Sequence, residues 1–219
     1  MNPSLQKKNL RAEFQRKIND IAFNDLITKS EKLVESFQQN FIKTTGPEAL
    51  SRRFIVSFCP FGNEPQINIE SEARNEPYEV AYIRISDWSK REIVSVQARR
   101  DQPGHWEELE VAKTKIFQPT IHQPVCAPEQ IAAILVPGLG FTPKGERLGR
   151  GVGFYDRYLK EHPQALRVGI AFTEQMIENL PCEPWDQKVD VILTDQGVLE
   201  VIETKLLGEW RTQGKILKR

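Results

Sequence analysis

The N-terminal part of the chain has the hydrophobic spacing of helices. Between Ser4 and about Phe41, apolar residues recur at steps of three and four positions with polar residues between them, and this period places them on one side of a helix. The sequence therefore predicts two helical segments here. Their apolar positions are Leu10, Phe14, Ile18 and Ile21 in the first segment and Leu33, Val34, Phe37 and Phe41 in the second.

Short runs of β-branched, aliphatic and aromatic residues follow, and they have the length and composition of strands. The runs at 79–85 and 92–97 alternate between apolar and polar positions, which indicates one wetter face. We predict strands at 53–59, 79–85, 92–97, 131–136, 167–171 and 189–193, helices at 154–160 and 174–179, and a loop at 101–108.

Strands and helices alternate in the second half of the chain, and this order is typical of an α/β fold. We expect an open, mostly parallel sheet with helices on both faces, Rossmann-like and three-layered, with N-terminal helices, in a single domain over residues 1–219. The uninterrupted apolar run at 131–136 suits a central strand that is covered on both faces. Ligands of such sheets bind beyond the carboxyl ends of the strands, where the segment 138–156 would begin.

Composition narrows the classes of function. The 219 residues include 30 Lys plus Arg and 30 Asp plus Glu, so the balanced charge does not favour a polyanionic partner such as nucleic acid. Cys59, Cys126 and Cys182 lie far apart, without the spacing of a zinc site or a disulfide framework. The N-terminus is too polar for a signal peptide, and no run approaches the roughly 18 apolar residues of a membrane span. We therefore expect a cytoplasmic protein with small-molecule partners and with neither nucleic-acid nor membrane partners.

The segment 136–159, VPGLGFTPKGERLGRGVGFYDRYL, has the composition of an anion site. Glycines permit positive φ, so that successive N–H groups can turn toward an anion, and arginine forks match phosphate oxygens. The pattern matches neither the common phosphate loop nor the dinucleotide fingerprint, and taken alone it also fits a flexible surface loop with solvated arginines. Its alternating residues are Gly149, Gly151 and Gly153, among Arg147, Arg150 and Arg157.

The whole string, PGLGF-x₃-G-x-RLGRG-x-G-[FY]-YD-x-YL, resembles the signature segment of the 5-formyltetrahydrofolate cyclo-ligase family. Other parts of the family's pattern occur in the same order. They are Lys7 with Arg11 four residues on, PFGNEP at 60–65, FQP at 117–119, and VGIAFTEQMIENLP followed by WDQKVDVILTD near the C-terminus. The resemblance extends from Lys7 to about Asp195 and is loose between 70 and 115.

The resemblance implies an enzyme that uses ATP and Mg²⁺ to convert 5-formyltetrahydrofolate to 5,10-methenyltetrahydrofolate, with release of ADP and phosphate. It implies that the formyl oxygen is phosphorylated, that N10 then closes the ring, and that the enzyme is a monomer. Two alternatives stay open. One is a folate-binding protein that has lost phosphoryl transfer, and the other is an ATP-dependent ligase or kinase for another small molecule on the same scaffold.

The resemblance also implies roles for individual residues. It implies folate binding by Cys59, Phe61, Glu64, Arg150 and Phe154, catalysis by Arg150 and Tyr155, and Mg²⁺ binding by Asp156 and Asp186. Without it, Lys7 and Arg11 fit a solvated helix face, Glu64 and Asp186 fit turns, and Asp156 fits a helix cap. The residues implied for ATP are Lys7, Arg11, Arg147, Leu148, Gly149, Arg150, Gly151, Val152, Gly153, Phe154 and Tyr155.

Three positions depart from the family's pattern. Thr142 stands where Asp is frequent, Val152 where Gly or Lys is usual, and Phe154 in place of the first Tyr of a YYD triplet. The absence of a lysine at Val152 removes a positive charge near the phosphates, which bears on the rate more than on the reaction. The sequence offers no reason for Thr142.

Overall fold

The computed structural model describes residues 3–42, 50, 53–70, 73, 76, 78–111 and 114–200. Residues 1–2 and 201–219 of the predicted domain, and the short stretches between these ranges, lie outside the described residues.

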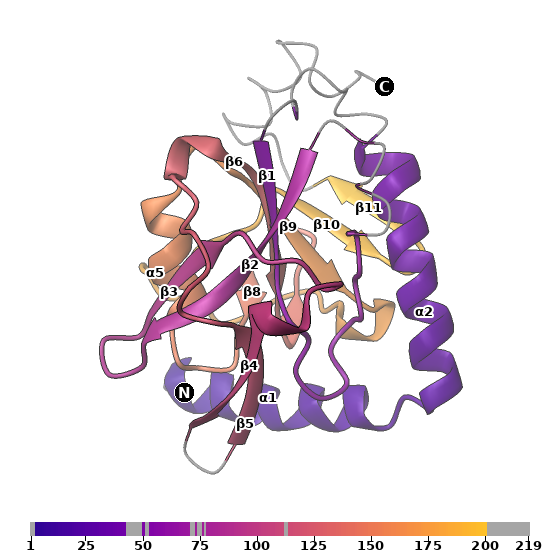
Figure 1. The fold of residues 1–219 in the computed structure, drawn as a ribbon. Helices are drawn as coiled ribbons and strands as arrows, with labels where there is room; N and C mark the ends of the chain where they lie inside the picture. The colour runs from indigo at the N-terminus through magenta and orange to yellow at the C-terminus, as the bar shows by residue number, and fades with distance from the viewer. Residues whose placement is uncertain are drawn as a thin grey trace.

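A seven-stranded sheet forms the centre of the described part of the chain, with strand order β11-β10-β9-β6-β1-β2-β3 (Figure 1). Neighbouring strands from β10 to β2 are parallel, whereas the edge strands β11 and β3 are antiparallel to their neighbours. This confirms the predicted mostly parallel α/β sheet. The strands are β1 (Arg53–Ser57), β2 (Tyr78–Asp87), β3 (Glu92–Val96), β6 (Ile131–Pro137), β9 (Leu166–Ala171), β10 (Val191–Thr194) and β11 (Gly197–Glu200).

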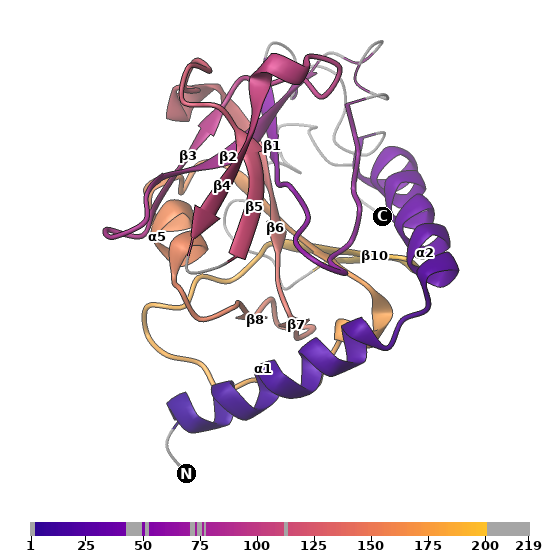
Figure 2. The same cartoon turned by 60° about the horizontal axis from the view of Figure 1, so that its bottom comes forward.

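Helices cover both faces of the sheet, as predicted (Figures 1 and 2). The helix α2 (Phe23–Ser36) continues as a π-helix (Phe37–Ile42), and its Leu33 is buried in the core on one face. The helix α5 (Phe154–Glu161) buries Leu159 in the core on the other face. None of the described helices combines the length and the apolar character that crossing a membrane requires.

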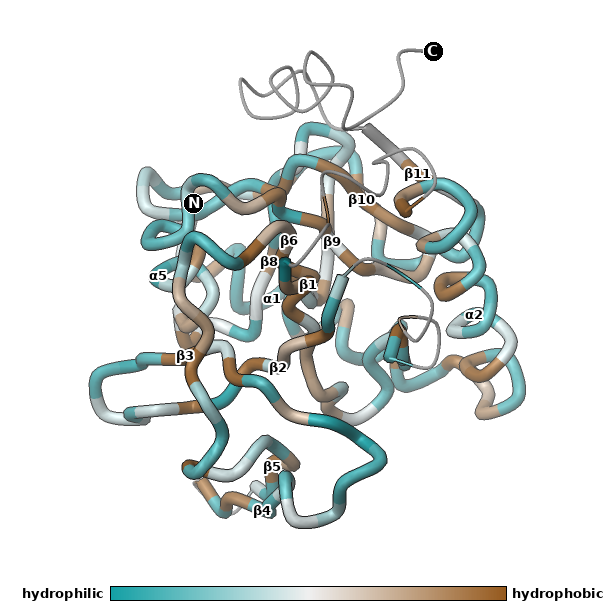
Figure 3. Tube along the Cα trace, turned by 45° about the horizontal axis from the view of Figure 1, so that its top comes forward, coloured by the Kyte–Doolittle hydropathy of each residue, from teal (hydrophilic) through white to brown (hydrophobic). Residues whose placement is uncertain are grey.

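Side chains of the central strands alternate between these two cores. In β1, Ile55 belongs to the core under α2, while Phe54 and Val56 belong to the core under α5. Residues 131–136 of β6 are fully inaccessible to solvent, and Figure 3 shows hydrophobic colouring along the central strands and hydrophilic colouring over the outer loops. The apolar run at 131–136 is therefore a central strand covered on both faces, as predicted.

The helix α1 (Pro3–Asn19) lies across the carboxyl-terminal edge of the sheet. Its Phe14 and Ile18 pack on Leu139 and Leu148, which belong to the segment that follows β6. Figure 2 shows α1 running beneath two short antiparallel strands of that segment, β7 (Gly140–Phe141) and β8 (Arg147–Leu148). The apolar face of α1 thus fixes the N-terminal residues beside the glycine-rich segment.

Two predictions of local structure are wrong. The predicted loop at 101–108 contains a 3₁₀ turn (Pro103–His105) and the start of β4 (Trp106–Val111), which pairs with β5 (Thr114–Pro119) in a separate ribbon. The WEELEV sequence of β4 has too little apolar character to predict a strand. Side-chain packing in the ribbon stabilises the strand, because the Trp106 ring stacks on the Phe117 ring with their centres 5.2 Å apart.

The predicted helix at 174–179 is reduced to one 3₁₀ turn, η5 (Thr173–Gln175). The buried side chain of Gln175 accepts a hydrogen bond from the Phe172 N–H (2.7 Å) and donates one to the Gly138 carbonyl (2.6 Å). The N–H of Ile177 donates to the carbonyl of Phe141 in β7 at 2.9 Å. These long-range bonds replace the helical ladder.

The order of the strands creates a crevice at one edge. From β1 the chain proceeds to β2 on one side, whereas from β6 it proceeds to β9 and β10 on the other, so the neighbours β1 and β6 flank the point at which the direction of winding reverses. In open α/β sheets, ligands bind at such a point beyond the carboxyl ends of the strands. The segments that follow β1 and β6 meet there, as the sequence predicted for the second of them.

Candidate active site

A cavity of ≈ 490 Å³ opens beyond the carboxyl ends of β1 and β6. One side is apolar, with side chains from the loop after β1, from the β2–β3 hairpin and from the β4–β5 ribbon. The other side is polar and is formed by α1, the glycine-rich segment and the chain around Asp186. The main apolar residues are Phe58, Phe61, Ile83, Ile85, Ile93, Ile116 and Phe117.

Every residue that the resemblance implied for the site lines this cavity, although the separate role of each stays a prediction. They come from α1, from the loop after β1, from the segment between β8 and α5, and from the chain before β10. They are Lys7, Arg11, Cys59, Phe61, Glu64, Arg147, Leu148, Gly149, Arg150, Gly151, Val152, Gly153, Phe154, Tyr155, Asp156 and Asp186.

The glycine-rich segment needs its glycines at two positions. Gly151 has φ 92° and Gly153 has φ 86°, which is the left-handed region that residues with a Cβ avoid. Gly153 caps α5, so that the helix begins at Phe154 on the wall of the cavity. At Gly151 space is also short, because a Cβ there would lie 3.0 Å from Cζ of Arg11.

The two basic residues of α1 point to the same side, as their spacing predicted. Arg11 Nε donates to the carbonyl of Gly149 at 2.9 Å. Lys7 Nζ is buried and lies 2.6 Å from Glu183 Oε2 and 2.6 Å from Asp186 Oδ2. Burial by itself would lower the pKa of Lys7, but the hydrogen bonds to the two carboxylates outweigh it, so the pKa is raised and the ammonium stays charged.

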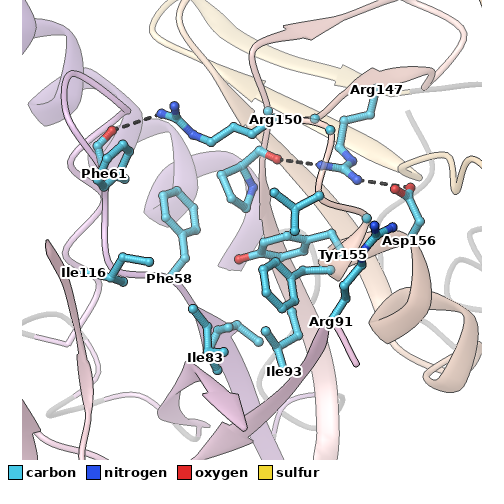
Figure 4. Close-up of a pocket in the computed structure, with 18 of the residues that line it drawn as sticks. Phe58, Phe61, Ile83, Arg91, Ile93, Ile116, Arg147, Arg150, Tyr155 and Asp156 are labelled. Carbon is cyan, nitrogen blue, oxygen red and sulfur yellow. Dashed lines mark hydrogen bonds and ion pairs between the residues drawn. The ribbon is translucent and has the colours of Figure 1, made fainter. Parts of the chain in front are cut away.

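Arg147 lines the cavity, and its side chain is only 5% exposed. Its Nη1 donates to the carbonyl of Pro137 at 3.1 Å, and its Nη2 lies 3.1 Å from Asp156 Oδ1. Its guanidinium also lies 5.5 Å from the ring centre of Tyr155. Figure 4 shows this arrangement, in which Arg147 joins the end of β6 to the first turn of α5.

Arg150 reaches across the cavity to the loop after β1. Its Nε donates to Glu64 Oε1 at 2.8 Å, and its Nη2 donates to the carbonyl of Phe61 at 3.2 Å, as Figure 4 shows for Phe61. Its guanidinium lies 4.8 Å from the centre of the Phe61 ring. Arg150 therefore connects a residue set implied for ATP with one implied for the folate.

Asp156 and Asp186 are held on neighbouring segments. Asp156 Oδ1 accepts the N–H of Gln187 at 3.2 Å, and Gln187 directly follows Asp186 in the chain. Each carboxylate is also paired with a cation, Asp156 with Arg147 and Asp186 with Lys7. Within the described ranges there is no group of three or more His, Cys, Asp or Glu side chains placed to hold a metal ion.

Burial keeps two other groups of the cavity neutral. It raises the pKa of Tyr155 well above its ordinary value, and the nearby Glu64 carboxylate raises it further, so the phenol remains a hydrogen-bond donor at neutral pH. Burial also raises the pKa of the Cys59 thiol to about 11, although Arg100 opposes this effect. Since the thiolate is the reactive form, Cys59 has little nucleophilic character at neutral pH.

The profile of the 5-formyltetrahydrofolate cyclo-ligase family matches residues 5–195, which is most of the chain. The chain belongs to this family. The family is one of enzymes, and the resemblance recognised from the signature segment is confirmed.

Relatives and solved structures agree with this assignment. The 5-formyltetrahydrofolate cyclo-ligase of Mus musculus is 25% identical over 210 residues, which cover 87% of this chain and 94% of the mouse protein. The solution structure of Aquifex aeolicus 5,10-methenyltetrahydrofolate synthetase matches with a TM-score of 0.70 and 27% identity, over 90% of this chain and 94% of that one. A 5,10-methenyltetrahydrofolate synthetase from Mycoplasma pneumoniae has the same fold, with a TM-score of 0.66 and 22% identity over 86% of this chain and 98% of that one.

The structure explains the departure from the family's pattern at Thr142. Its Oγ1 donates to Glu146 Oε2 at 3.0 Å and accepts the N–H groups of Lys144 (3.3 Å) and Glu146 (3.2 Å). By accepting these two N–H groups, the threonine hydroxyl closes the turn between β7 and β8 as an aspartate carboxylate does, and it donates one further bond to Glu146. The substitution preserves the turn that leads into the glycine-rich segment.

Several residues of the cavity were not predicted from the sequence. Trp88 and Arg91 come from the β2–β3 hairpin, Gln118 comes from β5, and Glu183 lies opposite Lys7. The hairpin itself has a turn signal in its sequence, but nothing local indicates that it folds over α5. These residues reach the site only through long-range packing.

Proposed function

We propose that this protein catalyses the ATP- and Mg²⁺-dependent conversion of 5-formyltetrahydrofolate to 5,10-methenyltetrahydrofolate, with release of ADP and phosphate. One observation carries the proposal: a single cavity joins an apolar wall large enough for an aromatic ring system to a wall of glycines and cations suited to phosphate. Membership of the family supports it. A cytoplasmic location, a monomeric state and a single domain over 1–219 remain predictions.

The reaction needs activation of a poor electrophile. The formyl group on N5 is an amide, whose resonance corresponds to a rotation barrier of about 18–20 kcal/mol. In the first step, the formyl oxygen attacks the γ-phosphorus of ATP, and the bond to the β,γ-bridging oxygen breaks so that ADP leaves. In the second step, N10 attacks the activated formyl carbon, the carbon–oxygen bond breaks, and the N10 proton leaves with the phosphate. The ring then carries one positive charge.

Phosphoryl transfer asks the protein chiefly to position two substrates and to stabilise phosphate charge. Arg11 and the N–H groups between Gly149 and Gly153 are suited to holding the phosphates at the polar wall. The neutral phenol of Tyr155 can donate a hydrogen bond to the formyl or phosphate oxygen. We assign the cation Arg150 to the boundary between the two substrates, since it belongs to the glycine-rich segment and its guanidinium contacts the loop of Phe61 and Glu64.

The apolar wall suits the pterin. Phe61 is 39% exposed, and it lies beside Cys59 at the mouth of the crevice. Phe154, at the start of α5, also lines the cavity, and the centre of its ring lies 5.2 Å from that of the Trp88 ring. These exposed aromatic surfaces are covered when a flat ring system enters, and water is excluded from the reacting carbon.

The two aspartates fit a magnesium ion that is shared with the nucleotide. Mg²⁺ commonly takes one or two carboxylates and completes its octahedron with water and phosphate oxygens, so such a site needs no larger ligand cluster than the described residues provide. Asp156 and Asp186 both face the cavity and are linked through the N–H of Gln187. The ion would supply charge neutralisation at the transferred phosphoryl group.

The decisive experiment follows the absorbance of the methenyl product on mixing the protein with 5-formyltetrahydrofolate, with and without ATP and Mg²⁺. We expect product only when all are present, with one ADP released for each ring closed. Binding of the folate without release of ADP would identify a binding protein instead. Consumption of ATP with a different metabolite, and none with the formyl-folate, would identify another ligase or kinase.

Asp156→Asn tests the metal assignment. We expect the concentration of Mg²⁺ that gives half-maximal rate to rise about 10-fold or more, because one of few ligands is lost. Asp101→Asn is the matched control, since Asp101 is exposed and pairs with Arg99 outside the cavity. A Mg²⁺ titration that is the same for Asp156→Asn and for the wild type contradicts the assignment.

A further inference from the structure

Among the described residues that line the cavity, five are cationic. Four of them donate hydrogen bonds to protein acceptors: Lys7 to two carboxylates, Arg11 to a carbonyl, Arg147 to a carbonyl and Asp156, and Arg150 to Glu64. The fifth is Arg91, whose guanidinium makes no hydrogen bond or ion pair with any described residue. An uncommitted cation facing a cavity is available to a ligand.

The backbone holds Arg91 in an unusual conformation. Its φ is 58°, and among the described residues other than glycine it alone has a positive φ. The residue ends the β2–β3 turn, and its N–H donates to the Trp88 carbonyl at 3.1 Å. Glycine and asparagine are the usual residues at such a position. The turn would therefore form more easily with a smaller residue, so turn geometry does not account for the arginine.

Packing holds the β2–β3 turn against the start of α5. The Trp88 ring lies 5.2 Å from the ring of Phe154, the first residue of that helix. One turn further on, Arg157 Nη1 donates to the carbonyl of Lys90 at 2.7 Å. These two contacts fix the hairpin on either side of Arg91, beside the end of the glycine-rich segment.

The side chain points to the polar part of the cavity. Figure 4 shows Arg91 on the side of Tyr155 and Asp156, with its guanidinium directed toward Asp156 and away from Phe61 and Ile116. The charged residues that line the cavity comprise the five cations and the four acids Glu64, Asp156, Glu183 and Asp186. The cavity thus carries a formal excess of one positive charge on the described residues, and the unpaired cation lies near the proposed metal ligand.

We propose that Arg91 binds a phosphate group of the nucleotide, and that it supplies from the β2–β3 hairpin a charge that the glycine-rich segment lacks at Val152. The proposal rests on the proposed function, since it takes the occupant of this wall to be a nucleotide. A folate carboxylate could also use a guanidinium. We favour phosphate because Arg91 faces the glycine-rich side, whereas the apolar wall proposed for the pterin lies opposite.

The proposal is tested by comparing the kinetics of Arg91→Gln with those of a control variant, Lys90→Gln. Lys90→Gln removes the same charge from the same hairpin, but Lys90 does not line the cavity. We expect Arg91→Gln to raise the KM for ATP about 10-fold while the KM for 5-formyltetrahydrofolate stays unchanged, and Lys90→Gln to change neither. Equal kinetics in the two variants would overturn the proposal. A rise confined to the KM for the folate would also overturn it, and would indicate a folate carboxylate as the partner.

A second variant separates binding from folding. Arg91→Gly removes the charge and, because glycine adopts a positive φ freely, keeps or improves the stability of the turn. We expect it to melt no lower than the wild type and to show the same increase in the KM for ATP. A glycine variant with wild-type affinity for ATP would exclude a contact between Arg91 and phosphate.

Calorimetric titration with ATP in the presence of Mg²⁺ distinguishes failure of this proposal from failure of the proposed function. If the wild type binds no ATP, the proposed function fails. If the wild type binds ATP and Arg91→Gln binds it equally well, only the proposal for Arg91 fails.

Discussion

Arg150 and Glu64 form an ion pair, with the Arg150 guanidinium 2.8 Å from Glu64 Oε1, and this pair joins the glycine-rich segment after β8 to the loop after β1. Glu64 is 7% exposed at its side chain and Arg150 is 34% exposed. Glu64 Oε2 also accepts the N–H of Phe61 at 3.0 Å. One carboxylate thus fixes the positions of both the Arg150 guanidinium and the Phe61 backbone. The proposed nucleotide and folate subsites therefore share a structural support.

A double-mutant cycle on this pair tests the shared support. We expect Arg150→Gln and Glu64→Gln each to lower kcat/KM about 10-fold or more, and the double variant to lose less than the product of the two. The reason is that each substitution already breaks the same contact. The measurement is steady-state kinetics for both substrates, with Arg99→Gln as the control in an exposed ion pair. Strictly multiplicative effects would mean that the two residues act independently.

Gly151→Ala and Gly153→Ala separate backbone strain from crowding. Both glycines have positive φ, so each alanine costs about 1–2 kcal/mol of folding free energy. Only at Gly151 would the new Cβ press on Arg11, since nothing lies within 4 Å of the Cβ position at Gly153. We expect similar losses of Tm for the two variants but a larger rise in the KM for ATP for Gly151→Ala. Equal effects on KM would show that the position of Arg11 does not matter for the nucleotide.

The raised pKa of Cys59 predicts slow alkylation of its thiol at neutral pH. With a pKa of about 11, the thiolate fraction at pH 7.5 is small and grows about 10-fold per pH unit. We expect mass spectrometry to show slow modification of Cys59 by iodoacetamide at neutral pH, acceleration toward pH 10, and protection by the bound folate. Cys182, which is exposed, should react faster at neutral pH. Faster labelling of Cys59 than of Cys182 at pH 7.5 would contradict the raised pKa of Cys59.

Asp195 makes a pH-dependent contribution to stability. Its side chain is 4% exposed and accepts hydrogen bonds from Lys29 Nζ (2.8 Å), the Thr173 N–H (2.7 Å) and Thr173 Oγ1 (2.8 Å). Burial alone would raise the pKa of this carboxyl, but these donors outweigh it and lower the pKa below its ordinary value. Asp195→Asn should therefore lower the free energy of unfolding by about 2 kcal/mol at neutral pH.

The sign of the pH effect follows from the lowered pKa. The stabilisation from ionised Asp195 is complete above the unfolded-state pKa of about 3.9 and is lost as the pH falls through the lower folded-state pKa. Urea unfolding from pH 7 to pH 3 should thus show the wild type and Asp195→Asn converging at low pH. Asp101→Asn, at an exposed pair, should change stability by less than about 1 kcal/mol. A constant gap between the wild type and Asp195→Asn across this range contradicts the argument.

The sequence by itself determined the features that depend on local spacing. The apolar run at 131–136 predicted a central strand, and the alternating glycines at 149–153 predicted a segment with positive φ before a helix. Lys7 and Arg11 were expected on one face of a helix, and both line the cavity. These predictions succeeded because strand burial, glycine conformation and helical period are set by a few neighbouring residues.

Only the tertiary structure decided which charges meet. Lys7 pairs with Asp186 across 179 positions of the chain, and Arg150 pairs with Glu64 across 86. The resemblance implied all four side chains for the site, with Lys7 for ATP, Asp186 for Mg²⁺, Glu64 for the folate and Arg150 for both substrates, but it gave no pairing between them. Arg91 was not predicted at all, because its place beside α5 depends on how a hairpin packs. Long-range pairing is set by the order of strands and the packing of helices on them, and no local pattern encodes it.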